Sequence, residues 1–449
     1  QLSMLDVKTP CFRFTILFFA CMLTFGSYYV FDLPSAIQEN LETYLNIKDD
    51  KYQLFYTCYT ISNFLSVCFG GYLLDKTGAR LGAIIFTGLI CTGQLIFGLG
   101  GQFKSYATMI VGRCVYGLGG GCICVCQESI TTHYFKGKEL ALAFGATLCV
   151  SRLGSVLNFF ISPPICEAIG VPATIWFSVS ICFLSIVFVS IFFYLDRKNE
   201  RETHQEMKAK TKKIVLKDLL SFTPEYWLLC AICAVFYGCI FPFIAVASKM
   251  FRQKWLFEKW NASVCTGIVY DVALVFSLPM GKLVDHVGKR LTFLVAATLI
   301  IVAANVTLVC ARQQDTWAPW VSMVMVGVAY CFTASTLWSG VSLVVKKAQI
   351  GSAMAIITAI QMFFNSVINV LIGQLKENQE AKMYVFVAQA LLSAILVIIL
   401  GVLDVKRHKV LNSKDSVGIF KDHEEKVEEK VEDLEKEGLL PTPNQDVEV

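Results

Sequence analysis

One short pattern occurs twice in this chain, and each copy separates two long apolar runs. Gly71-Tyr-Leu-Leu-Asp-Lys-Thr-Gly-Ala-Arg80 lies between the runs 51–74 and 81–101. Far downstream, Gly281-Lys-Leu-Val-Asp-His-Val-Gly-Lys-Arg290 repeats the order G-x-L-x-D-x-x-G-x-R. Glycine permits a sharp turn and close helix contact, and the carboxylate can pair with a cation or lie at a helix N-terminus. Two copies predict an internally duplicated helical bundle in which each turn joins two membrane helices.

The hydrophobicity of the chain supports this prediction. Of its 449 residues, 55% are hydrophobic and only 16% are charged, and apolar stretches of 18 or more residues recur along most of its length. Such stretches are typical of a polytopic helical membrane protein. We therefore predict an all-α fold with twelve spans in two six-helix bundles, the first span ending at Asp32 and Pro34. The expected parts are a tail at 1–10, bundles at 11–195 and 224–405, a polar linker at 196–223 and a charged, disordered tail at 406–449.

The basic loops predict the orientation of these spans. Twelve spans place both termini on one side, and most basic loops, including the central linker, lie on that side too. By the positive-inside rule that side is cytosolic. The stretch 249–259 is the exception, because it is basic but falls in a predicted outer loop. Asn261-Ala-Ser263 lies in the same loop and is a predicted glycosylation site.

The sequence offers no motif for catalysis or for a cofactor. The 18 cysteines lie mostly inside apolar runs and are expected to be packing residues rather than a disulfide framework. We do not expect Cys122, Cys124 and Cys126 to form a metal site, because Cys124 would lie on the opposite helix face from the other two and no histidine is near. Nucleotide-binding and HExxH motifs are missing from the sequence. We expect no catalytic residue, cofactor, metal or nucleic-acid partner, and a carrier must then run downhill or use an ion gradient.

Two ionisable residues are predicted near the middle of the membrane, where charges are costly and usually functional. Counting along the fifth and eighth spans places Arg152 and Asp271 at similar depth, one in each half. They form either a fixed salt bridge or two ends of a site between the halves. In the second case arginine suits a carboxylate and aspartate suits an amine, so the ligand is a zwitterion.

Other polar residues of the spans admit more than one role. Glu128 either meets an amine or joins a gate, and Arg113 either braces the first and fourth helices or has another function. Asp32 is interpreted as a structural charge. Further candidates for lining a cavity are Tyr237, Tyr270, Trp338, Gln361 and Asn365.

The repeated turn resembles the signature loop of the major facilitator superfamily at every fixed position. Arg113, followed by Gly117 and Gly119, resembles a second motif of that superfamily. The resemblance implies secondary transport by alternating access between two six-helix halves. It also implies that the turns act as cytosolic gates, with gating residues Gly71, Asp75, Lys76, Gly78, Arg80, Gly281, Asp285, Gly288 and Arg290.

The chain also resembles one branch of this superfamily, which contains a lysosomal dipeptide transporter. The likeness covers about 25–402 and includes Phe135-Lys-Gly-Lys-Glu-Leu140 and Arg152-Leu-Gly-Ser155. It implies export of dipeptides, with a preference for cationic ones, and a glycosylated accessory membrane subunit. In that branch the arginine matching Arg152 holds the peptide carboxylate, and a fourth-span glutamate holds the amine. Gly121 stands at the position of that glutamate here, which leaves Glu128 and Asp271 as replacements.

A sorting signal is predicted in the C-terminal tail. Glu435-Lys-Glu-Gly-Leu439-Leu440 matches the acidic dileucine pattern read by sorting adaptors. It predicts delivery to the lysosomal membrane, although the branch usually carries this signal in its N-terminal tail.

We therefore expect a transporter of dipeptides or similar zwitterions from the lysosomal lumen to the cytosol. A proton-coupled organic anion carrier is the nearest alternative, and a non-transporting membrane receptor or scaffold is the alternative of another class. The expected partners are the substrate, the lipid bilayer, sorting adaptors and the accessory subunit. The sequence does not distinguish uniport from proton coupling. It also leaves open the exact substrate and the oligomeric state, for which a homodimer is one option.

Overall fold

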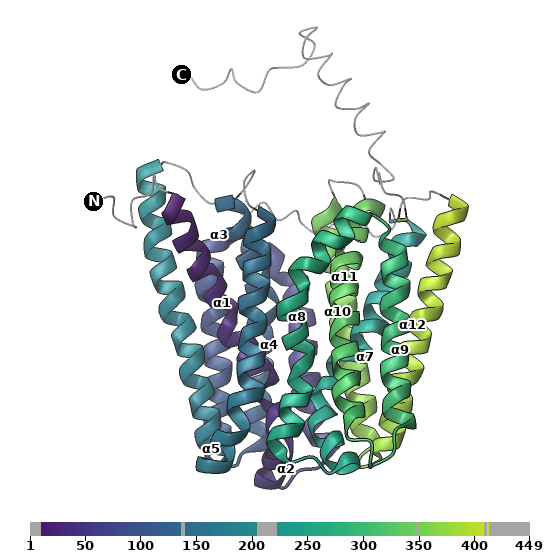
Figure 1. The fold of residues 1–449 in the computed structure, drawn as a ribbon. Coiled ribbons are helices and arrows are strands. Elements are labelled where there is room, and N and C mark those ends of the chain that lie inside the picture. Colours follow the sequence, from purple (N-terminus) through teal and green to yellow (C-terminus); the bar gives the residue numbers. More distant parts are fainter. Residues whose placement is uncertain (1–9, 136–139, 204–221, 346–348, 408–410, 413–449) are drawn as a thin grey trace, which may run out of the picture.

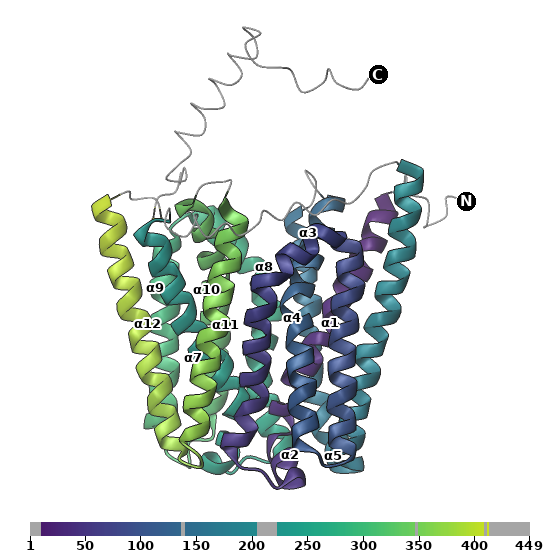
Figure 2. The same cartoon turned by 180° about the vertical axis from the view of Figure 1, so that it is seen from behind.

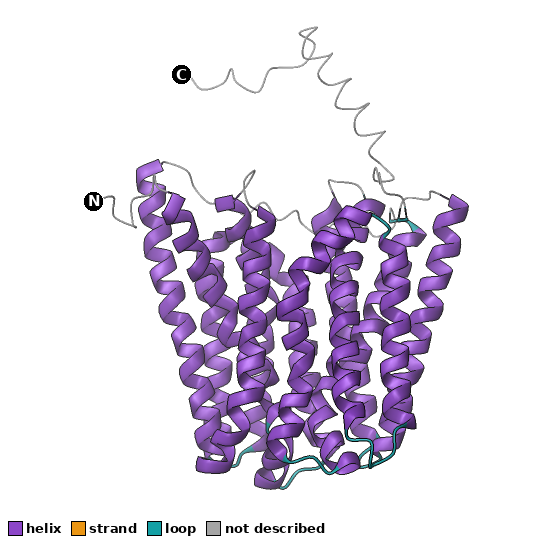
Figure 3. Cartoon of the chain, in the orientation of Figure 1, coloured by secondary structure: helices purple, strands orange, loops and turns teal. Residues whose placement is uncertain are grey.

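A computed structural model describes residues 10–135, 140–203, 222–345, 349–407 and 411–412 of the chain. Within these ranges the chain is helical, and no strand occurs (Figure 3). The helices are α1 (Pro10–Ala36), α2 (Gln38–Leu45), α3 (Asp49–Gln102), α4 (Tyr106–Phe135), α5 (Leu140–Thr203), α7 (Pro224–Trp255), α8 (Lys259–Val287), α9 (Arg290–Cys310), α10 (Trp317–Val344), α11 (Ile350–Gln374) and α12 (Gln379–Arg407).

Two of these elements each contain two helices joined at a glycine. The backbone of α3 turns at Gly78 (φ 78°), and that of α5 turns at Gly170 (φ 85°). With each counted as two, and the short α2 left aside, the described chain has twelve long helices, as predicted. Ten described segments are long and apolar enough to cross a membrane, and one of them, 145–200, includes both helices of α5.

The repeated sequence pattern has the same backbone conformation at its second glycine. Gly288, which ends α8, has φ 72° and lies at the position of the repeat that Gly78 occupies in the first copy. Positive φ is open to glycine and strained for most other residues. The sequence prediction of a sharp glycine turn therefore matches the backbone in both copies.

The helices form two bundles that lie side by side (Figures 1 and 2). One contains α1, α3, α4 and α5, and the other contains α7 to α12. The bundles meet where α3 packs on α11 and where α5 packs on α8. The start of α1 and the end of α12 lie on the same side of the molecule, which we call the terminal end. The short helix α2 lies on the opposite side, which we call the α2 end.

Close helix contacts hold α4 against both helices of α3. A Cβ added at Gly117 would lie 2.5 Å from the carbonyl oxygen of Tyr59, and one added at Gly119 would lie 2.6 Å from that of Phe86. These backbone atoms cannot move away as a flexible side chain can. The small residues that follow Arg113 therefore permit the close approach of α4 to both helices of α3.

Several predicted boundaries are wrong. α1 continues through Asp32 and Pro34 to Ala36, and the carbonyl oxygen of Val30, to which Pro34 cannot donate, accepts a hydrogen bond from Arg113. α7 continues to Trp255, so most of the basic stretch predicted as an outer loop is helical. Asn261 likewise lies in the first turn of α8 rather than in a loop. In each case apolarity located the membrane segment, and the helix continued beyond it.

α5 also extends into the predicted linker, as far as Thr203. Asp196, expected to be a linker residue, is buried and pairs with Arg80, and it accepts a hydrogen bond of 2.5 Å from Tyr134. Arg80 also pairs with Glu200 at 2.6 Å. These contacts explain why the helix persists after its apolar sequence ends.

Some predictions fall outside the described residues. They concern residues 1–9, most of the linker and the tail beyond 412, including the sorting residues Glu435, Leu439 and Leu440. The side chains of Asp75, Lys76 and Asp285 in the gating turns are not described either. The gating role of the turns stays a prediction.

Candidate functional site

Arg152 lies buried in α5, surrounded by aromatic rings from three other helices. Its guanidinium carbon is 5.0 Å from the ring centres of Tyr28 and Tyr330 and 5.3 Å from that of Tyr270. Arg152 Nη2 donates a hydrogen bond to the Tyr330 hydroxyl, whereas Nε is buried without a partner. Among the described residues no carboxylate forms an ion pair with Arg152. A buried cation with a free donor is suited to receive an anion.

Asp32 in α1 is the buried carboxylate nearest to this group of rings. It is 1% exposed, and its Oδ1 accepts a hydrogen bond of 3.1 Å from the Tyr270 hydroxyl. Its Oδ2 is buried without a hydrogen-bond partner. Tyr270 therefore touches both Asp32 and Arg152, and each of the two charged groups keeps one unused polar atom.

Arg113 has the surroundings expected of a bracing residue. Its Nη2 donates to the carbonyl oxygen of Val30 in α1 at 3.3 Å, and its guanidinium lies 4.8 Å from the ring centre of Phe97. The described charges buried in the middle of this bundle are then Arg113, Arg152 and Asp32. Their sum is one positive charge, which favours binding of an anion there.

The structure does not bring Asp271 to Arg152. Neighbouring residues of a helix point about 100° apart, so Asp271 faces away from the side of α8 on which Tyr270 meets α1 and α5. Asp271 is half-buried, and Val275, one turn further along the same side, is 63% exposed. No ion pair joins Asp271 to Arg152 among the described residues, so the fixed salt bridge is not formed in this conformation.

Glu128 lies on an exposed side of α4, one turn from Cys124. Cys124 is in hydrogen-bond contact with the Tyr28 hydroxyl at 3.8 Å, and Tyr28 is one of the three rings around Arg152. Glu128 therefore lies one turn of α4 away from a residue that contacts the rings around Arg152.

The other lining candidates have different positions. Tyr237 is buried, stacks on Phe241 and packs edge-on against Tyr330, so it belongs to the second layer around Arg152. Gln361 accepts a hydrogen bond from Cys233 at 3.7 Å, which ties α11 to α7. Trp338 is half-buried against the apolar core, and Asn365 is buried with its Oδ1 unpaired.

The sequence analysis missed Tyr28 and Tyr330 as site residues. Tyr28 lies near the start of the stretch 25–402 that the resemblance covers, and Tyr330 had no signal of its own. Aromatic residues in membrane helices commonly pack against neighbours or lipid, so only the fold shows that these two rings meet a buried cation.

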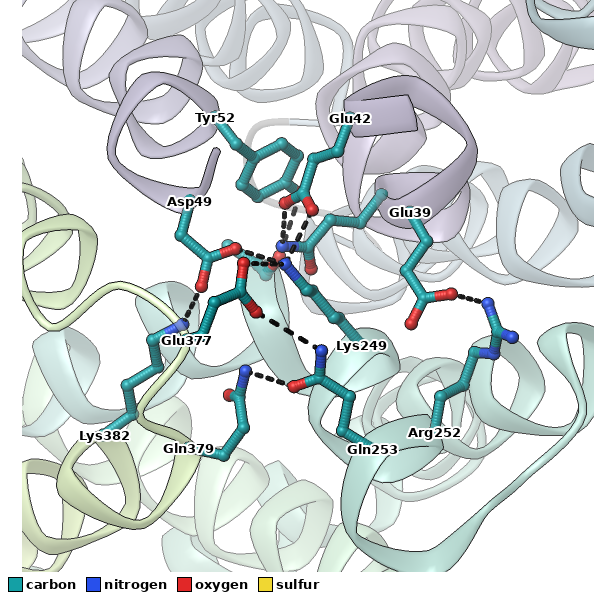
Figure 4. A network of polar contacts seen from close by, with 12 residues as sticks. Glu39, Glu42, Asp49, Tyr52, Lys249, Arg252, Gln253, Glu377, Gln379 and Lys382 are labelled. Atoms are coloured by element: carbon teal, nitrogen blue, oxygen red, sulfur yellow. Dashed lines mark hydrogen bonds and ion pairs between the residues drawn. The ribbon is translucent and has the colours of Figure 1, made fainter. Parts of the chain in front are cut away.

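A second cluster, at the α2 end, joins the two bundles and was also missed (Figure 4). Lys249 Nζ of α7 lies 2.7 Å from Glu42 of α2 and 2.5 Å from Asp49 of α3. Lys382 of α12 pairs with the other oxygen of Asp49, and Glu377 lies 3.2 Å from Lys249. We call these five residues the Lys249 cluster. The one signal for it in the sequence was the basic exception to the positive-inside rule.

Further contacts close the same end. Arg252 pairs with Glu39 beside the cluster. The Tyr52 hydroxyl donates to the carbonyl oxygen of Ala245 at 2.9 Å, and Ser35 donates to that of Ile244 at 2.6 Å. Because these bonds run between the bundles, the described structure is a conformation closed at the α2 end.

Comparison with protein families agrees with this architecture. The model of the Major Facilitator Superfamily matches residues 16–368, which is most of the chain. The chain belongs to the major facilitator superfamily. The prediction of a twelve-helix transporter fold, and of a transporter rather than an enzyme, is thereby confirmed.

Curated relatives and a solved structure give the same family. The chain is 32% identical to the "Lysosomal dipeptide transporter MFSD1" of Bos taurus over 388 residues, covering 84% of this chain and 82% of the relative. It is 31% identical to the Homo sapiens protein of that name, covering 84% and 83%. The nucleoside transporter NupG, in a mutant form, has a similar fold, with a TM-score of 0.71 at 11% identity over 87% of this chain and 99% of that one.

Proposed function

We propose that this transporter carries dipeptides or similar small zwitterions from the lysosomal lumen to the cytosol by alternating access. The names of the relatives supply the substrate class and the compartment. The α2 end then faces the lumen, and the terminal end, where the basic loops were predicted, faces the cytosol. The observation that carries the proposal is the buried guanidinium of Arg152, which lies between the bundles with an unused donor.

In this proposal the substrate carboxylate binds Arg152. The three tyrosine rings hold the guanidinium by cation–π contact and exclude water, which strengthens a charge-assisted hydrogen bond. The excess positive charge in the middle of the first bundle works in the same direction. The length of the peptide that fits is then set by the distance between Arg152, which binds the carboxylate, and the group that binds the amine.

Asp32 is the carboxylate that we propose for the amine. It is buried, it keeps Oδ2 unpaired, and it shares Tyr270 with Arg152. An ammonium group at Oδ2 would complete its hydrogen bonds and neutralise a charge that is expensive in a membrane interior. Asp271, on another side of α8, is the second candidate, and Glu128 is the residue that we propose for a cationic side chain of the substrate.

Binding measurements with blocked dipeptides test both contacts. Arg152→Lys keeps the charge but loses the planar fork, so a dipeptide with free ends should bind about 2 kcal/mol more weakly, roughly 30-fold in Kd. The same dipeptide with an amidated carboxyl end should bind the wild type and Arg152→Lys equally poorly. The series also includes dipeptides with a cationic side chain, which test the expected preference for such substrates.

The amine contact is read from dipeptides with an acetylated amino end. Asp32→Asn should weaken binding of the free amine and leave the acetylated peptide unchanged, with Asp271→Asn as the comparison variant. If Asp271→Asn shows that selectivity and Asp32→Asn does not, the amine contact lies at Asp271. If Arg152→Lys binds free and amidated peptides as the wild type does, Arg152 holds no carboxylate. If acetylated peptides bind as tightly as free ones, the organic anion carrier is the better description.

We propose that delivery to this compartment uses the dileucine signal at Leu439 and Leu440, which lies outside the described residues. Replacing both leucines with alanine should move the protein to the cell surface, because an adaptor groove needs both apolar side chains. Unchanged overlap with lysosomal markers would show that another signal delivers it.

The accessory subunit, the homodimer and glycosylation at Asn261 stay predictions. Comparison of glycosidase-treated wild type with Asn261→Gln tests the glycosylation.

A further inference from the structure

The Lys249 cluster contains more carboxylates than ammonium groups. Three acids, Glu42, Asp49 and Glu377, surround two lysines, Lys249 and Lys382. Four of the five side chains are buried, with 9% exposure or less, and Glu377 alone is 59% exposed. A proton on one acid would balance the charge of the cluster.

The contacts show which acid can take up that proton at least cost. Asp49 pairs with both lysines, and its loss would leave Lys382 without the carboxylate it contacts. Glu377 is 59% exposed, so water solvates its carboxylate. Glu42 is buried and pairs with Lys249 only, and Lys249 would still contact the two other acids after Glu42 became neutral.

The other neighbours of Glu42 do not stabilise its charge strongly. On α2 the amide of Gln38 donates to Glu42 Oε1 at 2.7 Å, and on α3 the Tyr52 hydroxyl is turned to Ala245. On α7 the second cation, Arg252, is paired with Glu39. On α5, Cys166 accepts a hydrogen bond from Asn40. The charged groups that act on this thiol are Lys259 and Glu167. Ala36, which ends α1, and Ile37, which joins α1 to α2, are buried and apolar.

We propose that Glu42 is a proton-binding site of the gate at the α2 end, and that uptake of a proton there favours the closed gate. The proton comes from the luminal water, converts the carboxylate to a carboxylic acid and stays on the luminal side. No proton crosses the membrane in this step. The inference depends on the proposed function only in naming this end luminal.

The direction of the pH effect follows from the burial of Glu42. Burial raises the pKa of Glu42 from its usual 4.5 to about 7 in the closed gate, although hydrogen bonds from Lys249 and Gln38 work against this. In an open gate the side chain is in water and its pKa returns to the usual value. Between these two values the closed form binds more protons, so acidification stabilises closure and alkaline conditions oppose it.

The experiment measures closure directly, without substrate. Two fluorophores are introduced through unnatural amino acids at positions 103 and 256, which are 76% and 71% exposed and lie at the α2 end of different bundles. Energy transfer between them reports the closed fraction in the full-length protein. From pH 7.5 to pH 5 the ratio of closed to open molecules should rise on the order of 50-fold in the wild type.

Glu42→Gln mimics the protonated acid, so it should be biased to the closed gate at both pH values and lose most of the pH response. Glu39→Gln changes the neighbouring acid, which pairs with Arg252 at the surface, and should keep the response of the wild type. Lys249→Met should open the gate and shows that the labels detect opening. Acidification that opens the gate, or a wild-type response in Glu42→Gln, would overturn the proposal. Failure of dipeptide binding with a normal pH response would instead refute the proposed function alone.

Discussion

At the scale of single residues, the sequence predicted the charge of the candidate site and named Tyr270 among the lining candidates, but it missed the other two rings. A lone arginine in an apolar span stands out because burying it is expensive. The rings around it do not stand out, because tyrosines in such spans fit many kinds of packing. Tyr330 is separated from Arg152 by 178 residues, and only the packing of α10 on the other bundle brings them into contact. Asp271 was expected opposite Arg152 from its depth alone, but depth along a helix says nothing about the direction in which a side chain points, and among the described residues no ion pair joins the two.

The hydroxyl of Tyr330 should tune substrate affinity. Tyr330→Phe keeps the ring over the guanidinium and removes the acceptor that holds Arg152 Nη2 in place. We expect a loss of about 1 kcal/mol, or roughly fivefold in KM for a peptide with a free carboxylate, with little change in maximal velocity. Tyr384→Phe, in an exposed position of α12, is the matched control and should leave KM unchanged. Uptake measured with purified protein in vesicles checks this prediction. An unaltered KM in Tyr330→Phe would show that the hydroxyl does not contribute to substrate affinity.

At the scale of helices, the sequence located nearly every long helix and both copies of the glycine turn. It placed the helix ends poorly, since apolar length measures the bilayer and helices extend past it. The last turns of α7 contain Lys249, Arg252 and Lys254, which looked like loop residues. Their charges are satisfied by acids of the other bundle and by backbone carbonyls of α9, which a local pattern cannot show.

Close packing of α1 on α5 should depend on Gly154. A Cβ at this position would lie 2.5 Å from the carbonyl oxygen of Phe25 and 3.3 Å from the amide nitrogen of Tyr29, so α1 would have to move. We expect Gly154→Ala to destabilise the protein by about 1–3 kcal/mol, as overpacking does. Gly88→Ala is the matched control, because a Cβ there meets nothing within 4 Å, and alanine favours a helix. Thermal unfolding of both purified variants gives the comparison, and equal melting temperatures would show that α1 and α5 can separate at no cost.

At the scale of the whole molecule, duplication was readable from the sequence, whereas the closed end was not. Two copies of one turn were enough to predict two similar bundles. The conformation depends on contacts between the bundles, and the ion pairs of Asp49 with Lys249 and Lys382 join residues 200 and 333 positions apart. The positive-inside rule treated the basic stretch 249–259 as a loop facing the lumen. Its first lysine is instead the centre of a buried cluster, because acids from the other bundle neutralise it.

Asp49 should be the residue on which closure of the α2 end depends most. It is fully buried and contacts both lysines of the Lys249 cluster, so Asp49→Asn leaves Lys382 buried without a carboxylate in contact. Removing one member of a buried pair typically costs about 3–5 kcal/mol. We therefore expect Asp49→Asn to lower the melting temperature strongly and to shift the molecule towards the conformation open at this end.

Removing the stranded cation as well should reverse part of that loss. In the double variant Asp49→Asn with Lys382→Met, Lys249 still contacts Glu42 and Glu377, and an apolar side chain of similar length replaces the buried ammonium group. The single variant Lys382→Met should be milder than Asp49→Asn, because Asp49 keeps Lys249. Glu39→Gln breaks a half-exposed pair and should cost at most about 1 kcal/mol. Thermal unfolding of the four variants, with energy transfer between positions 103 and 256, gives this order. If Asp49→Asn is no more damaging than Glu39→Gln, the buried ion pairs do not hold the two bundles together.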